Sequence, residues 1–338
     1  MSSRIHTFVN HSQGMKKILI PLMITASVLC GACGKKSDAS PVHIAELYDS
    51  ISEYGSLSRA DRDIFFSGNR EALDAFFKVL GYGGVTDSLI QVWSKSDAVS
   101  VFTPTVDSVF PTLEPLEHQL GAIVSNAEEL GLKFKTDTYV AVVWGNRRSI
   151  VFVDSVMLIA LNHYLGTDYE GYVGWPEYMR VGKTPEQLPY DICEALVATN
   201  YPYQSAADAS VLSRLVYEGL LIEAKQRLVD DASLAQSLGY TSEQLAYVKE
   251  NEQSLWNRLV ELRMIYDTSE FTVERLVSPA PATFILGNDV PPRVGRYIGY
   301  RIVESYLKKH DNIRLADMLR PEFYNNPALL VESGYSSK

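Results

Sequence analysis

The sequence has few cysteines and a deficit of basic residues. It holds 31 Lys and Arg against 41 Asp and Glu, for a formal net charge of −10 over 338 residues. Residues 1–32 contain three basic and no acidic residues, so the chain without them carries −13. This balance argues against a nucleic-acid partner, because phosphate binding requires a basic footprint. It argues equally against broad contact with an anionic lipid surface.

The apolar run near the N-terminus is too short to cross a bilayer. It extends from Ile18 to Leu29, twelve residues, and follows Met15 and two lysines, whereas a spanning helix needs about 20 apolar residues. A basic start, a short apolar run and small residues are typical of a secretory signal peptide. We therefore expect residues 1–32 to be a signal peptide whose true start is Met15.

The residues that follow predict a lipid anchor. Gly31-Ala32-Cys33 resembles a bacterial lipobox, although Cys30 stands where a leucine-like residue is usual. We expect Cys33 to carry the lipid, a palmitate-bearing anchor to the outer membrane, and residues 33–42 to form a tether. Residues 35–38 lack the acidic run of many surface-exposed lipoproteins, which favours the periplasmic side. The alternative is an ordinary secreted protein cut nearby, and both place the domain outside the cytoplasm.

These assignments leave Cys193 as the one thiol of the mature domain, which excludes an intramolecular disulfide. Its neighbours Ile192, Ala195 and Leu196 are apolar at helical spacing. This context predicts a small core residue rather than a nucleophile.

Hydrophobic periodicity predicts a helix-dominated α+β fold with one small sheet. We expect one domain over 43–330, with a helical part at 43–98 and a second part at 99–330. Strands are expected near 100–103, 139–144 and 149–153, the last two as a hairpin around Gly145–Arg148, while 156–164 is either a strand or a helix. Residues 170–189 read as a loop. The expected helices are 43–54, 70–80, 88–93, 106–130, 190–199, 211–228, 241–266, 271–277 and 291–309.

The helix at 291–309 has an unusual composition. Asp289 is expected to cap it, and Pro291 and Pro292 suit its first positions. Gly295 and Gly299 lie one turn apart, and each costs roughly 1 kcal/mol against Ala in a helix interior. Such a cost suggests that another backbone or side chain lies very close to this helix.

Several short segments, taken in order, form a recognisable series: 162–166, 217–219, 239–245, 250–252, 279–281 and 292–303. Together they resemble the GldB family of gliding-motility lipoproteins of Bacteroidetes. The resemblance covers most of 135–330 and is most specific in the last third, while the N-terminal helices match loosely. It implies an envelope lipoprotein that works by binding or assembly with an envelope protein partner, in gliding motility, secretion or envelope maintenance.

That family is similar in turn to predicted zincin-like zinc peptidases, which carry a His-Glu-x-x-His helix and a glutamate on a second helix. Two histidines four residues apart share one helix face and bind the metal, with the second-helix glutamate completing its shell. Here residues 190–198 contain no histidine, although Glu218 keeps the third-ligand position. The resemblance therefore implies a pseudo-peptidase with no catalytic residues, metal or cofactor. Its degenerate cleft is formed by Asp191, Glu194, Glu218, Arg293 and Arg296.

The residues leave both the arrangement of the carboxylates and the function of the cleft open. Glu194 and Glu218 are expected to form an ion network with Arg214, Arg293 or Arg296, and a carboxylate-only cation site is the competing arrangement. A residual metal-dependent hydrolase would use Asp191 with the two glutamates. The other alternative function is binding: the cleft would hold a small acidic ligand or a peptide terminus through its arginines. No other catalytic motif is present: none of the histidines at 43, 118, 163 and 310 sits in a recognisable nucleophile–base pattern.

Overall fold

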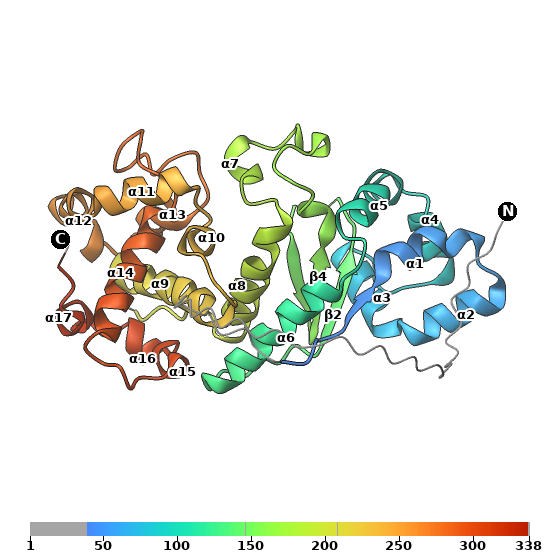
Figure 1. Cartoon of the computed structure of the whole chain (residues 1–338), viewed down its shortest axis with the longest axis horizontal. Helices are drawn as coiled ribbons and strands as arrows, with labels where there is room; N and C mark the ends of the chain where they lie inside the picture. Colours follow the sequence, from blue (N-terminus) through green and yellow to red (C-terminus); the bar gives the residue numbers. More distant parts are fainter. Residues whose placement is uncertain (1–38, 146, 208, 337–338) are drawn as a thin grey trace, which may run out of the picture. The chain divides into compact units, whose positions relative to one another are not determined.

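A small mixed sheet organises the first half of the chain in the computed structural model, which describes residues 39–145, 147–207 and 209–336 (Figure 1). Its strands are β1 (Ile44–Glu46), β2 (Thr138–Val142), β3 (Ile150–Val153) and β4 (Val156–Ala160), in the order β1-β2-β4-β3. β1 and β4 both pair with β2 in parallel, and β3 pairs with β4 antiparallel. The fold is therefore helix-dominated α+β, as predicted.

The predicted hairpin between 139–144 and 149–153 is wrong. β2 and β3 do not pair, because β4 lies between them. All five residues of β4 are buried, whereas those of β3 are only half-buried, so the most apolar strand occupies an inner position. The tight turn instead joins β3 to β4 through Asp154 and Ser155, with Asp154 in the left-handed region at φ 54°, which suits a two-residue hairpin loop.

The strand predicted at 100–103 is also wrong. These residues lie inside α5 (Asp97–Val109), where the Ser96 side chain accepts a hydrogen bond from the backbone N–H of Val99. The cap outweighs the β-propensity of the valines. The helix predicted at 106–130 is two helices, α5 and α6 (Glu114–Glu129), and Pro111 lies in the break between them.

Other helices follow the predicted periodicity with shifted ends. Residues 43–54 begin as β1 and continue as a helix, α1 (Leu47–Glu53), and the next helix, α2 (Arg59–Gly68), had no counterpart in the prediction. Residues 156–164 are β4 followed by a 3-10 turn. The predicted loop at 170–189 contains the short α7 (Glu177–Arg180), and the predicted helix at 241–266 divides at Asn251 into two helices. The remaining bounds are α3 (Arg70–Val79), α4 (Asp87–Trp93), α8 (Leu188–Asn200), α9 (Val211–Leu228), α10 (Leu234–Leu238), α11 (Ser242–Glu250), α12 (Glu252–Glu261), α13 (Glu270–Val277), α14 (Val294–Leu307), α15 (Leu315–Met318), α16 (Pro321–Tyr324) and α17 (Leu329–Ser333).

α14 and α9 pack backbone to backbone, as the two glycines of α14 predicted. A Cβ on Gly299 would lie 1.7 Å from the carbonyl oxygen of Leu215, and one on Gly219 would lie 2.2 Å from the carbonyl carbon of Gly299. Only glycine permits this distance. α9 also contacts α8, which reaches β3 of the sheet, so these three helices connect the C-terminal part to the sheet (Figure 1).

The predicted start of α14 is wrong. Asp289 does not cap it and the two prolines precede it, because the helix begins at Val294 after Arg293, which has φ 54°. The cap comes from a preceding loop: the Thr283 hydroxyl donates to the carbonyl of Pro291 at 2.7 Å and accepts from the N–H of Val294 at 3.3 Å. Pro291 and Pro292 are buried as they lead into this turn.

One continuous core runs through the described residues, from Ile44 in β1 to Leu329 in α17. These residues belong to one compact unit. No helix within the described ranges combines the length and apolar character needed to cross a bilayer.

Candidate functional site

Three packed helices bring charged side chains together in the interior. Arg296 of α14 lies between Glu194 of α8 and Glu218 of α9, with Nη2 to Glu194 Oε2 at 2.8 Å and Nε to Glu218 Oε2 at 3.1 Å. Lys225 of α9 also pairs with Glu194, and Arg214 Nη2 lies 2.9 Å from Glu218 Oε1. We call these five residues the ion network. The contacts of Arg296 are ion pairs by distance, although its Nε and Nη2 have no well-aligned hydrogen bond among the residues that the structure describes.

The centre of the ion network is almost closed to water. The side chains of Arg296 and Lys225 are 5% and 3% exposed, and that of Glu218 is 9% exposed, whereas those of Glu194 and Arg214 are each 29% exposed. Burial by itself would raise the pKa of Glu194, but the charges of Arg296 and Lys225 outweigh it and hold that pKa well below the ordinary value of 4.5. Burial lowers the pKa of Lys225, and the charge of Glu194 opposes this shift. Glu194 is therefore a carboxylate held between two cations.

The sequence explains how the ion network forms. Arg214 and Glu218 are four residues apart on α9, so they share a helix face. Glu218 is adjacent to Gly219, and Arg296 lies three residues before Gly299 on α14. The close backbone approach at these glycines therefore positions the Arg296 guanidinium against Glu218.

A cavity of about 430 Å³ lies beside the ion network. Four of the five residues predicted to form a cleft line it, namely Asp191, Glu194, Arg293 and Arg296, whereas Glu218 does not. The remaining lining comes from the start of β3, from the segment after β4, from α7 and the segment between α7 and α8, from α8 and α9, and from the loops before α11 and α14. Those residues are Ser149, Ile150, Tyr164, Tyr178, Met179, Gly182, Lys183, Gln187, Ala195, Ala198, Lys225, Gly239 and Pro279.

Arg293 does not join the ion network, although the sequence allowed for it. Its Nη2 donates to the carbonyl of Gly239 at 3.1 Å, and its Nε has no hydrogen-bond partner within the described residues. Burial, followed by the nearby charge of Arg296, lowers the pKa of Arg293. Asp191 is separate too, since its oxygens accept from the Tyr164 hydroxyl at 2.9 Å and from Gln187 Nε2 at 3.1 Å.

Two lysines of the site were missed from the sequence. Lys225 lies seven residues after Glu218 on α9, and two helical turns put both on one face, so the spacing could have indicated it. Lys183 lies in a segment without periodicity. Its Nζ donates to Ser149 Oγ at 2.6 Å and lies 5.2 Å from the centre of the Tyr164 ring.

The described residues contain no cluster of three or more His, Cys, Asp or Glu side chains arranged to hold a metal ion. His118 is exposed, with a side-chain exposure of 55%. Cys193 is buried, and burial raises the pKa of its thiol to about 12. This agrees with the predicted core role.

Comparison with known proteins adds to this geometry. The family described as gliding motility protein GldB matches residues 37–337. This chain belongs to the GldB family. The match includes the N-terminal helices, which the sequence motifs covered only loosely, and it associates the chain with gliding motility and the cell envelope.

The comparisons give no match to a peptidase. Neither the curated proteins nor the solved structures give a significant match. The likeness to zincin-like peptidases therefore stays a prediction from the motifs. The predicted signal peptide and Cys33 lie outside the described residues.

Proposed function

We propose that this GldB-family chain is a non-catalytic envelope lipoprotein that works by binding a protein partner in an assembly serving gliding motility, secretion or envelope maintenance. The observation that supports a binding role over catalysis is the state of Glu194 and Glu218. Both carboxylates would be needed as ligands or bases in a peptidase-like site, and both are paired with buried or half-buried cations.

Metal binding at these carboxylates would require displacing Arg296 or Lys225. Each is nearly inaccessible to water and held against a carboxylate. Removing one partner of a buried pair costs about 3–5 kcal/mol. The ion network therefore fits a structural role between α8, α9 and α14, and the proposed binding role depends on other surfaces.

The proposal also includes the anchor. Lipidation at Cys33 would attach the domain to the outer membrane through residues 33–42, with the domain on the periplasmic side. The domain would then meet its partner at the membrane, which raises the effective concentration of both.

The test uses cells that make the protein. Deleting the gene is expected to impair gliding or envelope integrity, and the full chain should restore it. Photo-crosslinking in intact cells, followed by purification, should capture a defined envelope protein. A Cys33→Ala chain should lose membrane attachment and restore function poorly, while Cys193→Ala, a matched change at the buried thiol, should stay attached to the membrane. Full complementation by the unanchored chain together with no captured partner would refute the proposal.

A further inference from the structure

The cavity beside the ion network is lined by more cationic side chains than the carboxylates of the network can pair with. Four cationic side chains line it, namely Lys183, Lys225, Arg293 and Arg296. Arg296 and Lys225 pair with Glu194 and Glu218. Asp191 is then the one lining carboxylate left near Arg293 and Lys183, so these two cations carry an excess of one positive charge.

Neither Arg293 nor Lys183 has a salt bridge to a carboxylate in the described part of the chain. Within the described ranges, Arg293 makes one hydrogen bond, to the Gly239 carbonyl, and its buried Nε has no hydrogen-bond partner. Lys183 donates to the Ser149 hydroxyl and lies against the Tyr164 ring. Asp191 acts on both cations through space but forms no salt bridge with either among the described residues. A half-buried cation without a direct anionic contact is costly, so an incoming anion would stabilise both residues.

The rest of the lining selects the kind of anion. Ile150, Tyr178, Met179, Ala195 and Pro279 give the cavity apolar and aromatic walls, and its volume falls in the range of small-ligand sites, roughly 300–1,000 Å³. Asp191 and Glu194 lie on the same lining and disfavour a dianion such as phosphate. Arginine binds a carboxylate through two parallel hydrogen bonds.

We infer that this cavity binds the carboxylate of an organic monoanion with an apolar body, with Arg293 and Lys183 as its anion contacts. Two sources share this chemistry, the free C-terminus of a peptide and a small organic acid. The inference rests on the proposed binding role and names the ligand class of one of its sites. Arg296 and Lys225 act as positioning residues, since they hold α8, α9 and α14 around the cavity.

The experiment is calorimetric titration of the full mature chain at low salt. The probes are N-acetyl-alanyl-leucine, its C-terminal amide, and hexanoate. We expect the free acid to bind and the amide to bind at least about tenfold more weakly, because the amide lacks the charge-assisted hydrogen bonds. Binding of hexanoate as well as the peptide acid identifies an organic-acid site, and binding of the peptide acid alone identifies a peptide terminus.

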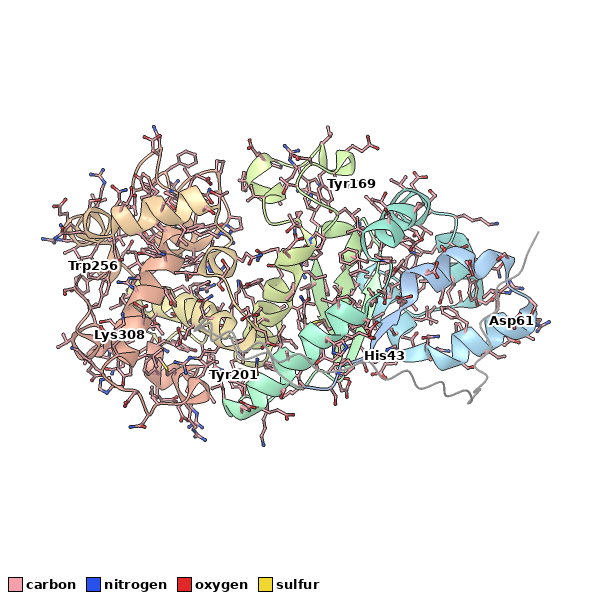
Figure 2. The ribbon with its side chains drawn as sticks, in the orientation of Figure 1. His43, Asp61, Tyr169, Tyr201, Trp256 and Lys308 are labelled. Carbon is pink, nitrogen blue, oxygen red and sulfur yellow. The ribbon has the colours of Figure 1, made fainter. Side chains whose placement is uncertain are left out.

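Matched variants locate the contacts. Arg293→Gln and Lys183→Gln should each weaken binding of the acid about tenfold. Lys308→Gln removes one positive charge at the exposed end of α14, away from the cavity lining, and should leave binding unchanged (Figure 2). Thermal melting checks the fold of each variant, and Lys183→Gln decides the matter if Arg293→Gln does not fold.

Three results would overturn the inference: no binding of either acid, equal binding of acid and amide, or wild-type affinity in the folded variants. These failures are distinguishable from failure of the proposed function. A negative titration with normal complementation and partner capture rejects the carboxylate site alone. A positive titration from a chain that captures no partner and is dispensable in cells rejects the envelope assembly role.

Discussion

Replacing Gly299 by alanine tests the close approach of α14 to α9, which positions Arg296. The new Cβ would lie 1.7 Å from the carbonyl oxygen of Leu215, whereas ordinary contact begins near 3.4 Å. The obstacle is helix backbone and has no rotamer to change. α14 must therefore move away from α9, and Arg296 must move with it.

The expected magnitude combines two opposing effects. Alanine gains roughly 1 kcal/mol of helix propensity over glycine. Overpacking a close contact costs about 1–3 kcal/mol and more when backbone must shift, and the shift also lengthens the pairs of Arg296 with Glu194 and Glu218. We expect a net loss of about 2 kcal/mol or more in the free energy of unfolding.

Urea unfolding followed by circular dichroism measures this loss. Gly68→Ala is the matched control, because Gly68 ends α2 and its Cβ would meet nothing within 4 Å. That variant should be as stable as the wild type or gain up to about 1 kcal/mol. Gly219→Ala, at the other side of the same contact, should be destabilised too, and the double variant should lose less than the sum. If Gly299→Ala matches the Gly68→Ala control, the argument for an obligatory close approach fails.

Three further predictions concern the ion network and the thiol. Arg296→Met removes the cation between Glu194 and Glu218 and should cost about 3–5 kcal/mol in urea unfolding, while Arg314→Met, at an exposed pair, should change stability little. Because the folded-state pKa of Glu194 lies below its unfolded value, its stabilisation is present above about pH 5 and is lost as pH falls toward the folded pKa. Urea unfolding from pH 6 to pH 3 should therefore show a shallower decline for Glu194→Gln than for the wild type. Cys193 should resist a thiol reagent in the native protein and react on unfolding, because it is buried and its pKa is raised to about 12.

Each of these has a contradicting outcome. An Arg296→Met protein as stable as the Arg314→Met control would show that the buried pairs contribute nothing net. Parallel acid profiles for the wild type and Glu194→Gln would mean that Glu194 is not held ionised. Rapid modification of Cys193 in the native state, at the rate of a free thiol, would contradict its core position.

Local sequence patterns predicted much of the architecture. The 3.6-residue spacing of apolar side chains located α9 correctly at both ends, and it placed α3, α8 and α13 to within a few residues. Gly295 and Gly299 indicated a close contact before any partner was known. The order of the motifs led to the correct family.

Pairing and capping depended on parts of the chain distant in sequence. The order β1-β2-β4-β3 follows from which strand is most apolar on both faces, and adjacency in sequence wrongly favoured β2 with β3. The start of α14 depends on Thr283 in a preceding loop. Propensity at 100–103 was overridden by the Ser96 cap and by packing.

For the site, too, some features were predictable from the sequence and others only from the tertiary structure. The sequence by itself determined the family, the absence of a histidine metal helix at 190–198, and the carboxylates and arginines that meet near α9, because these depend on residue identity and spacing. Only the tertiary structure decided that Arg296 bridges Glu194 and Glu218, while Arg293 and Lys183 on the cavity wall form no salt bridge to any described carboxylate. The physical reason is that a charge's partner is set by three-dimensional distance and burial. The Gly219–Gly299 contact fixes that distance, and no pattern along one helix contains it.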